Sequence, residues 1–354
     1  MKVVFICGGT GKSMYPLSED KFFLNLLGKP LLHHQIIVAR DAGLTHFVIV
    51  GNPGNIKRME EITSVFPDIT VETAIQQYPL GIANALEAAS KYLDDEIIVV
   101  NPNDIFYSSA YLSLLLERNL DSAESYMLGY KVDQYFPGGY LVVDKKDYLK
   151  SIVEKPEKGS EPSDMVNVLI HMHTDPQKLL EYAAKIETEG DDAYERTLDS
   201  MIKDGQRIKV LPLPGAWNAI KYPWHIQEVV KRFFTQFETY ISPTAKISDR
   251  AKIEGKVIIA NRVVIMENAV VRGPVFIGPG TIIGTNSLVR DNSHIGANCN
   301  IGFSTEIKGS YIGDNNYFHM NYIGDSIIGD NCNFGAGTKT ANYRFDEGNV
   351  KVNI

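Results

Sequence analysis

The most constraining feature of this sequence is a six-residue repeat in its C-terminal third. Every sixth position from Ile241 to Ile307 holds isoleucine or valine, which gives twelve consecutive matches. The side chain four positions after each match is mostly small or β-branched, as at Ala245 and Val257. This hexapeptide repeat is typical of a parallel β-helix. Because each coil of such an array buries its apolar face only against the next coil, we expect one quasi-linear domain.

The register of the repeat changes after Ile307 and returns at a different spacing. Apolar residues then mark the pattern at Ile312, Ile323, Ile328 and Phe334. Irregular stretches of a scaffold are places where functional side chains can be held. The polar residues of this stretch are therefore candidates for a site.

The first part of the chain alternates short apolar runs with helix-like segments. Strands are predicted at residues 3–6, 47–50, 69–75 and 97–100, and helices at residues 30–43, 56–65 and 81–92. This alternation predicts βαβ units and a Rossmann-like sheet, hence an α/β domain. We expect this domain over residues 1–225, a connecting helix over 226–240 and the β-helix over 241–354.

A glycine-rich loop follows the first predicted strand. Gly8, Gly9 and Gly11 precede Lys12, and successive backbone N–H groups in such a loop can form an anion-binding nest. A phosphate-binding loop is one interpretation, and a tight turn without a ligand is the other. A Walker loop is excluded because Ile6 stands where its first glycine is needed, and Met14 excludes a dinucleotide fingerprint.

Polar residues also follow the third and fourth predicted strands. Gln76 comes after the third strand, and Asn101, Asn103 and Asp104 come after the fourth. Ligands of open α/β sheets bind at these strand ends. A carboxylate there is a good Mg²⁺ ligand, although Asp104 could equally cap the helix that begins near Ser108 or close a turn.

Composition narrows the classes of function. The net charge of −8, without a basic run, argues against nucleic-acid binding. No apolar run reaches membrane-spanning length, so we expect no membrane partner. The three cysteines, Cys7, Cys299 and Cys332, are far apart and odd in number, which argues against disulfides or a zinc site. We therefore expect a cytoplasmic protein.

Residues 1–226 resemble the sugar-1-phosphate nucleotidyltransferase family. The family loop G-G-x-G-T-R-x-x-P-L aligns with the ten residues from Gly8 to Leu17. Pro137–Tyr140 and Ile152–Pro156 match the family segments that hold the sugar and its phosphate. The resemblance implies transfer of a nucleotidyl group from a nucleoside triphosphate to a sugar 1-phosphate, with Mg²⁺ as cofactor. The expected products are pyrophosphate and a UDP- or dTDP-linked hexose or N-acetylhexosamine.

The same resemblance assigns roles to individual residues of this domain. It implies that Lys21 and Asp104 are catalytic and that Asp104 is the Mg²⁺ ligand. The implied nucleotide-binding residues are Gly8, Gly9, Gly11, Lys12, Gln76 and Gly81. The implied sugar-phosphate-binding residues are Gly139, Glu154, Lys155 and Asn167.

Two departures from the family pattern leave an alternative open. Ser13 stands where the family has an arginine that steadies the triphosphate, and Ala219 stands where it has a second metal-binding aspartate. A lysine such as Lys12 cannot replace the two-pronged contact of that arginine. The alternative is a catalytically degenerate homologue that binds sugar or nucleotide as a regulatory or scaffold subunit.

The region from His319 to Tyr343 resembles the acetyltransferase domain of the bifunctional glucosamine-1-phosphate acetyltransferase and N-acetylglucosamine-1-phosphate uridyltransferase enzymes. The resemblance implies a left-handed β-helix, a homotrimer and acetyl-CoA as a co-substrate. It implies that His319 is a general base, which suits a neutral imidazole. A surface histidine without a role is the alternative. The implied sugar-phosphate-binding residues here are Arg290, Lys308, Tyr322, Asn333 and Asn342.

The C-terminus bears on this second activity. In the resembling enzymes, further coils follow and carry much of the acetyl-CoA site, whereas this sequence ends at Ile354 with only Ala336 of that set. Three possibilities remain open: the chain is naturally short, a site between chains suffices, or the activity is lost.

Overall fold

The computed structural model describes residues 1–188, 190–348 and 350, and the chain packs as two compact units. Unit 1 comprises Met1–Gly11 and Leu31–Ala219, and unit 2 comprises Lys12–Pro30 and Ile220–Ile354. The segment Lys12–Pro30 therefore packs with the C-terminal part of the chain, although the sequence assigned it to the first domain. The last residues of the predicted β-helix, 349 and 351–354, lie outside the described residues.

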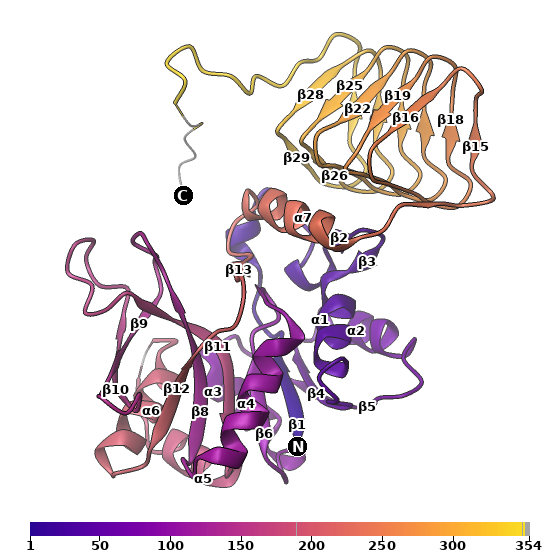
Figure 1. The fold of residues 1–354 in the computed structure, drawn as a ribbon. Coiled ribbons are helices and arrows are strands. Elements are labelled where there is room, and N and C mark those ends of the chain that lie inside the picture. Colours follow the sequence, from indigo (N-terminus) through magenta and orange to yellow (C-terminus); the bar gives the residue numbers. More distant parts are fainter. Residues whose placement is uncertain (189, 349, 351–354) are drawn as a thin grey trace. The chain divides into compact units, whose positions relative to one another are not determined.

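A nine-stranded mixed sheet forms the centre of unit 1 (Figure 1). Its strands are β1 (Lys2–Ile6), β4 (His46–Gly51), β5 (Thr70–Ile75), β6 (Ile97–Val100), β8 (Ser125–Lys131), β9 (Gly139–Val143), β10 (Leu149–Glu154), β11 (Met165–His173) and β12 (Ile208–Pro212). The order is β10-β9-β11-β6-β1-β4-β5, and β8 pairs with β11 and β12. Strands β6, β1, β4 and β5 are parallel, whereas β11 is antiparallel to β6.

The central strands are buried because helices cover the sheet. All four residues of β6 are inaccessible to solvent, which explains their continuous run of isoleucine and valine. The helices are α1 (Leu31–Arg40), α2 (Ile56–Thr63), α3 (Gly81–Ala88), η3 (Ser90–Tyr92), α4 (Ser108–Leu120), α5 (Pro176–Ala183) and α6 (Ala193–Lys203). Helix α5 begins at proline, and the side chain of its cap Asp175 accepts a hydrogen bond from Lys178 N–H at 3.0 Å.

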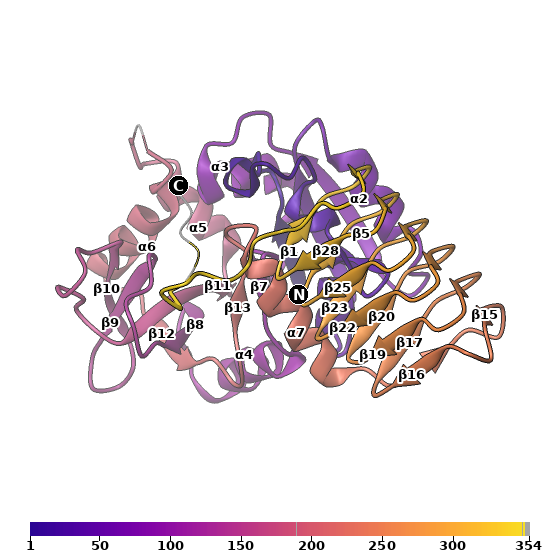
Figure 2. The ribbon, with the colours of Figure 1, turned by 90° about the horizontal axis from the view of Figure 1, so that it is seen from above.

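Unit 2 contains a left-handed β-helix with three parallel sheets. One sheet stacks β14 (Tyr240–Ile241), β17 (Val257–Ile259), β20 (Val275–Ile277), β23 (Ser293–Ile295), β26 (Tyr311–Ile312) and β29 (Ile327–Ile328). The second stacks β15 (Lys246–Ile247), β18 (Val264–Ile265), β21 (Ile282–Ile283), β24 (Asn300–Ile301), β27 (Tyr317–Phe318) and β30 (Asn333–Phe334). The third stacks β16 (Lys252–Glu254), β19 (Val270–Arg272), β22 (Leu288–Arg290), β25 (Glu306–Lys308) and β28 (Tyr322–Gly324), seen side by side in Figure 2.

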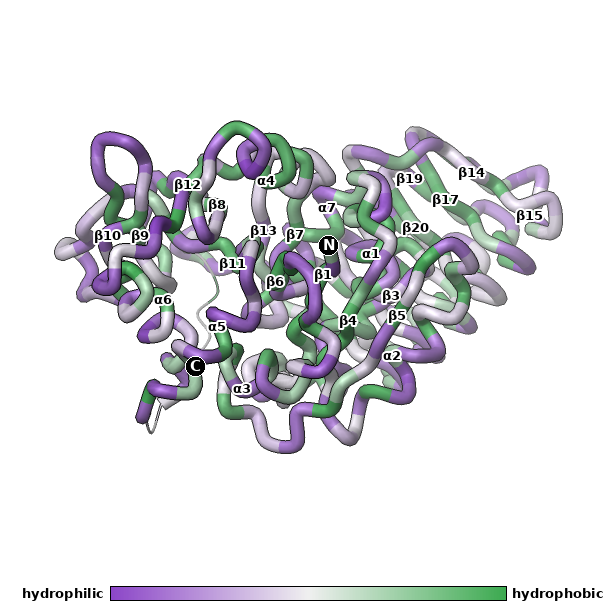
Figure 3. The backbone as a smooth tube through the Cα atoms, turned by 90° about the horizontal axis from the view of Figure 1, so that it is seen from below, coloured by the Kyte–Doolittle hydropathy of each residue, from purple (hydrophilic) through white to green (hydrophobic). Residues whose placement is uncertain are grey.

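The repeated isoleucines and valines form the core of this β-helix. The predicted change of register is a shortening of the coils. Ile283 pairs with Ile301, eighteen residues later, whereas Ile307 pairs with Ile323, only sixteen residues later. Phe318, which the sequence pattern missed, occupies the core position above Ile301. Figure 3 shows hydrophobic colouring along β6 in unit 1 and along β17 in unit 2. The predicted fold class is confirmed.

The segment Lys12–Pro30 packs against the β-helix within unit 2. It contains η1 (Lys12–Met14), η2 (Lys21–Phe23) and the small hairpin of β2 (Asn25–Leu26) and β3 (Lys29–Pro30). Leu27 N–H donates a hydrogen bond to His294 Nε2 at 3.2 Å. The His294 ring lies between Phe276 and Tyr311, with ring centroids 4.7 and 4.8 Å away.

Helix α7 (His225–Gln236) also belongs to unit 2, and Gln227 Nε2 donates to Gly309 O at 3.3 Å. Across the described part of the chain, no helix has the length and apolar character needed to cross a membrane.

Candidate functional site

The glycine loop leaves the sheet at the end of β1. Asn55 Nδ2 donates to Cys7 O at 2.9 Å, and Asn52 Nδ2 lies 3.4 Å from both Gly8 O and Gly9 O. The loop carbonyls are therefore held by the turn that follows β4. In contrast, the backbone N–H groups of residues 8–11 donate to no residue that the structure describes. This arrangement leaves several N–H donors for an anion, as the phosphate-loop interpretation requires.

Gln76, at the end of β5, lies directly against this loop. Its side chain is buried, and Nε2 donates to Gly81 O at 2.9 Å and to Asn84 Oδ1 at 3.1 Å. A Cβ atom on Gly8 would lie only 2.0 Å from Gln76 Oε1, so any larger residue would displace Gln76. Gly81 has a φ of +89°, and a Cβ there would meet Asp191 O at 2.7 Å. The structure thus brings Gly8, Gln76 and Gly81 together.

Asp104 occupies β7 (Asp104–Ile105), which pairs antiparallel with β13 (Asn218–Ala219). The carboxylate is 7% exposed, and Oδ1 accepts a hydrogen bond from Trp217 Nε1 at 3.0 Å. Its backbone carbonyl accepts from Gln35 Nε2 at 3.0 Å. The helix-cap alternative is wrong, because Tyr107 is the N-cap of α4 and no side chain caps that end.

Ala219 is the register partner of Asp104. Directly opposed residues of an antiparallel pair have Cβ atoms about 5 Å apart on one face. A carboxylate at position 219 would therefore stand beside Asp104. Among the described residues, no group of three or more His, Cys, Asp and Glu side chains could hold a metal. The site offers one protein carboxylate, which fits a Mg²⁺ ion whose other ligands are water and substrate phosphates.

The predicted sugar-phosphate residues of unit 1 also meet. Gly139 and Glu154 are register partners, and a Cβ on Gly139 would lie 2.7 Å from Glu154 Oε2 and 3.7 Å from Asn167 Cβ. Glycine at position 139 therefore leaves room for both side chains. Lys155 follows with a left-handed φ of +43°, and its Nζ lies 3.9 Å from Glu154 Oε1. The two carboxylate oxygens of Glu154, the Asn167 amide and the exposed Lys155 ammonium thus lie together at the ends of β9, β10 and β11.

Sequence reasoning missed the side chains behind Asn167. Asn167 Oδ1 lies 2.8 Å from His171 Nε2, although the two residues are four apart on one strand. A β-bulge makes this contact possible, because Leu128 and Met127 of β8 pair with Val168 and His171. His171 and His173 both contact Tyr194 in the first turn of α6. The alternation of the two histidines in a strand was the only signal in the sequence.

Burial displaces the pKa values of the ionisable groups here, and it raises the pKa of Tyr194 well above its usual value. Burial lowers the pKa of His173 to about 3 and holds the pKa of His171 well below its usual value. Both rings are therefore neutral at physiological pH. Burial raises the pKa of Glu195 to about 7, and the negative charge of Glu154 adds to the effect. Glu195 is a further candidate site residue that the sequence did not reveal.

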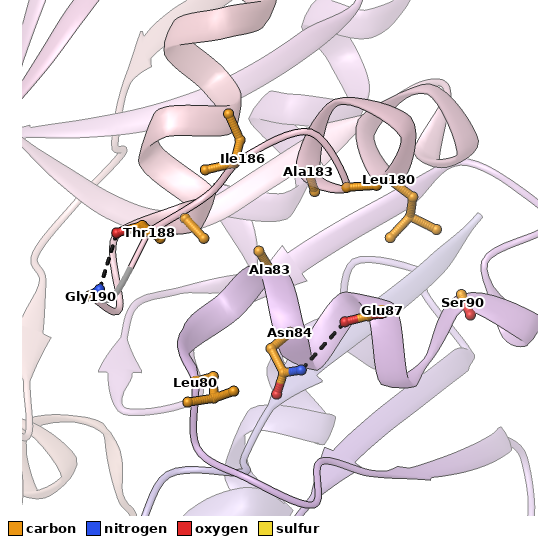
Figure 4. A pocket seen from close by; sticks show the side chains of 12 residues that line it. Leu80, Ala83, Asn84, Glu87, Ser90, Leu180, Ala183, Ile186, Thr188 and Gly190 are labelled. Atoms are coloured by element: carbon orange, nitrogen blue, oxygen red, sulfur yellow. Dashed lines mark hydrogen bonds between the residues drawn. The ribbon is translucent and has the colours of Figure 1, made fainter.

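A cavity of about 520 Å³ lies beside α3 in unit 1 (Figure 4). Helices α3 and α5 and the segment before α6 form its walls, mostly with alanine, leucine and isoleucine side chains. Neither Gln76 nor Asp104 lines it. Asn84 connects the two regions, since it lines the cavity and accepts the Gln76 hydrogen bond. The cavity is therefore separate from the strand-end site.

Lys12, Ser13 and Lys21 belong to unit 2. Lys12 and Ser13 lie in η1, immediately after the glycine loop in sequence. Lys21 begins η2, where the side chain of Asp20 caps the first turn by accepting from Phe22 N–H at 3.3 Å. This cap helps to hold the backbone that carries Lys21.

The β-helix brings together part of the second predicted set. Arg290 and Lys308 are register partners on neighbouring coils. Lys308 Nζ forms an ion pair with Asp325 at 2.9 Å, and Asn342 Nδ2 donates to the same carboxylate at 2.5 Å. Asn342 also lies 3.3 Å from Tyr322 OH. Asp325 is a member of this cluster that the sequence did not suggest.

His319 and Asn333 stand apart from this cluster. His319 is exposed at the corner after β27, where its backbone N–H donates to Asn321 Oδ1 at 2.5 Å. Asn333 is exposed on β30 and pairs with Tyr317. No contact within the described residues joins the side chain of either residue to Lys308, Tyr322 or Asn342. The predicted acetyltransferase set is therefore assembled only in part within one chain.

Comparisons with known proteins agree with this architecture. The family model for nucleotidyl transferase matches residues 2–220. The chain is 36% identical over 359 residues to the bifunctional protein GlmU of Methanococcus maripaludis strain C7, covering 100% of this chain and 84% of the relative. It is 32% identical over 360 residues to the bifunctional sugar-1-phosphate nucleotidylyltransferase/acetyltransferase of Sulfurisphaera tokodaii, covering 100% of this chain and 86% of the relative.

Solved structures show the same fold over about two thirds of the chain. A UDP-glucose pyrophosphorylase from Acinetobacter baumannii covers 66% of this chain and 94% of its own, with a TM-score of 0.56 and 17% identity. A putative glucose-1-phosphate thymidylyltransferase from Bacillus anthracis covers 64% of this chain and 93% of its own, with a TM-score of 0.57 and 18% identity.

Proposed function

Because the chain belongs to the nucleotidyl transferase family, we propose that it forms a nucleotide sugar from a nucleoside triphosphate and a sugar 1-phosphate. The observation that carries this proposal is the meeting of the glycine loop, Gln76 and Gly81 at one edge of the sheet. Open N–H donors for a triphosphate and a buried amide for a base occur there side by side.

In the proposed reaction, an oxygen of the sugar phosphate attacks the α-phosphorus of the triphosphate. The new bond forms as the bond to the β-phosphate breaks, and pyrophosphate leaves with the electron pair. The protein contributes position and charge rather than a covalent intermediate. The glycine-loop N–H groups hold phosphate oxygens, Gly139 and Asn167 hold the sugar, and Lys155 offsets negative charge. The family resemblance assigns a charge-offsetting role to Lys21 as well.

Asp104 is the proposed anchor for Mg²⁺. When bound, the ion would neutralise the charge that develops on the phosphates. Asp104 is suited to this role because its carboxylate accepts the Trp217 Nε1–H and its backbone lies in the pairing of β7 with β13. The single carboxylate requires the nucleotide to complete the ligand set.

Gln76 supports a uracil or thymine base. Both hydrogens of its Nε2 are engaged, by Gly81 O and by Asn84 Oδ1. The remaining polar atom, Oε1, is an acceptor. Uracil and thymine present an N3–H donor to such an atom, whereas cytosine presents an acceptor. We therefore expect UTP or dTTP to be preferred over CTP.

The test is pyrophosphate release with Mg²⁺ across a panel of nucleoside triphosphates and sugar 1-phosphates. Asp104→Asn should lower kcat by at least 100-fold because the metal anchor loses its charge. Asp95→Asn, at an exposed position, is the matched control and should be unaffected. Absence of release with every pair would refute the proposal. Ligand binding without release would favour the regulatory or scaffold alternative.

We further propose an acetyl-CoA-dependent acetyltransferase activity, favoured by the cluster of Lys308, Tyr322, Asn342 and Asp325. In this reaction, a sugar amine attacks the thioester carbonyl and His319 takes the amine proton. The carbon–sulfur bond breaks, and the coenzyme A sulfur leaves with the electron pair and takes up that proton. The corner position of His319 suits a site completed by a second chain, in line with the expected homotrimer.

Thiol release from acetyl-CoA in the presence of glucosamine 1-phosphate tests this second activity. His319→Ala should abolish the release, whereas His46→Ala, at an exposed position on β4, should not change it. An unchanged rate in His319→Ala would reject the assignment. Pyrophosphate release should be unaffected in both variants.

A further inference from the structure

A series of five hydrogen-bonded side chains runs through the interior of unit 1 and ends at Asn167. Ser125 Oγ lies 2.8 Å from His173 Nδ1, and His173 Nε2 lies 2.8 Å from Tyr194 OH. The same hydroxyl lies 2.9 Å from His171 Nδ1, and His171 Nε2 lies 2.8 Å from Asn167 Oδ1. The first four members of this series, Ser125, His173, Tyr194 and His171, are at most 1% exposed. We name Ser125, His173, Tyr194, His171 and Asn167 the relay.

The hydrogen bonds of the relay can run in only two directions if the Tyr194 O–H is to have an acceptor. If both histidines donated to the Tyr194 oxygen, this 1% exposed hydroxyl would be a buried donor without a partner. A neutral imidazole donates from one nitrogen and accepts at the other, and a tyrosine hydroxyl has one proton to donate. If Ser125 donates to His173 Nδ1, then His173 Nε2–H donates to the Tyr194 oxygen. The Tyr194 hydroxyl in turn donates to His171 Nδ1, and His171 Nε2–H donates to Asn167 Oδ1. In the opposite direction, every donor reverses and Asn167 Nδ2 donates to His171.

The buried end of the relay decides between these directions. Ser125 is 1% exposed, and within the described residues His173 is the sole hydrogen-bond partner of its hydroxyl oxygen. In the opposite direction, the Ser125 O–H would be a buried donor without an acceptor, at a cost of about 1–3 kcal/mol. Asn167 is half-buried, so its free amide atom can be solvated in either direction. The relay therefore runs from Ser125 to Asn167.

This direction fixes the role of Asn167. Its Oδ1 is occupied as an acceptor of His171 Nε2–H, which leaves the Nδ2 hydrogens for a ligand. Asn167 lies beside Gly139 and Glu154, where the proposed function places the sugar. We propose that His171, Tyr194 and His173 are positioning residues that lock the Asn167 amide as a hydrogen-bond donor to the sugar.

The inference rests on the proposed function for its substrate and adds a selection rule. The sugar 1-phosphate must present an acceptor oxygen to Asn167 Nδ2, either a hydroxyl oxygen or the carbonyl of an N-acyl group. A protonated amine at the same position has only donors and is disfavoured. Without the relay, an asparagine amide could turn over and serve either kind of group.

The relay can be tested without any substrate. In the full chain with ¹⁵N-labelled histidine, His171 and His173 should both show the neutral tautomer that carries hydrogen on Nε2, unchanged from pH 6 to 8. His171→Gln and His173→Gln would assign the two signals. A hydrogen on Nδ1 of either ring, or titration of either ring in this range, would overturn the inference even if the proposed activity were confirmed.

Kinetics tests the consequence for the sugar. Tyr194→Phe and His171→Leu should raise KM for the sugar 1-phosphate about tenfold and leave KM for the nucleoside triphosphate unchanged. His171→Gln should restore KM, because its amide can accept from Tyr194 and donate to Asn167. Tyr182→Phe removes a hydroxyl bound to exposed Asp204 and is the matched control.

Equal rises in both KM values, or an unchanged KM in Tyr194→Phe, would overturn the positioning role. If no substrate pair reacts, the proposed function fails, and the tautomer measurement still decides the direction of the relay. If Tyr194→Phe does not fold, His171→Leu and His171→Gln provide the same comparison.

Discussion

At the scale of single residues, the nucleotidyl site is defined by one carboxylate and the alanine opposite it. Asp104 and Ala219 are paired across an antiparallel bridge, so position 219 faces the same space as the metal anchor. Asn218 is the register partner of Ile105, and neighbouring strand residues point to opposite faces. Asn218 therefore does not replace a missing carboxylate.

We predict that Ala219→Asp increases the affinity of the enzyme for Mg²⁺. A second carboxylate beside Asp104 should lower the Mg²⁺ concentration needed for half-maximal pyrophosphate release by about tenfold or more. Asn218→Asp is the matched control, because it adds the same charge on the other face. An equal effect of both variants, or no effect of Ala219→Asp, would show that position 219 does not face the metal.

Glu195 gives a prediction for stability as a function of pH. Its pKa in the folded protein is about 7, above the usual value of 4.5, so the folded state binds the proton more tightly than the unfolded state. The contribution to stability is present below pH 4.5 and is lost as pH rises to about 7. Glu195→Gln should therefore be more stable than the parent at pH 8, by up to about 3 kcal/mol, and similar at pH 4.5.

Urea unfolding at the two pH values measures this difference. Glu181→Gln, on the exposed side of α5, is the control and should change stability little at either pH. A gain for Glu195→Gln that is the same at pH 4.5 and pH 8 would contradict the raised pKa.

At the scale of elements, the segment Lys12–Pro30 depends on the β-helix. Its Leu27 N–H is accepted by His294, and Gly28 lies against Phe276. Burial lowers the pKa of His294 to about 4, so the ring remains a neutral acceptor at physiological pH. The β-helix therefore supports the segment that carries the proposed catalytic Lys21.

We predict that His294→Phe loosens this segment while keeping the aromatic stack. Leu27 N–H would lose its acceptor, which should speed its hydrogen exchange about tenfold or more. Amides in the β6 strand should exchange at the parent rate. His46→Phe, at an exposed position, is the control substitution. Parent-like exchange of Leu27 in His294→Phe would refute this dependence.

The sequence predicted elements whose pattern is set locally and missed contacts that depend on distant packing. The isoleucine repeat and the alternation of strands and helices follow from side-chain periodicity, so both folds were predictable. The glycine loop and Asp104 lie at strand ends, where their sequence neighbours reveal their place. The relay depends on a bulge in β11 and on Tyr194 from a helix more than twenty residues later, and no local pattern indicates such a contact. Phe318 was missed because the coil shortened around it.

At the scale of the whole molecule, the two units carry two proposed chemistries with different degrees of completeness. Unit 1 brings its predicted sugar-phosphate residues together, whereas unit 2 joins Lys308 and Tyr322 through Asn342 and Asp325 but leaves His319 at an exposed corner. A homotrimer would supply further side chains to that corner and stays a prediction. The nucleotidyl reaction is therefore the activity that the described residues support most completely.

The most direct test follows oxygen atoms through the proposed reaction. The enzyme would be given Mg²⁺, UTP or dTTP, and a sugar 1-phosphate whose three non-bridging phosphate oxygens are ¹⁸O, and the products would be analysed by mass spectrometry. Attack on the α-phosphorus predicts a nucleotide sugar that retains all three labelled oxygens and pyrophosphate that contains none. Labelled pyrophosphate, or the absence of a nucleotide sugar, would contradict the account.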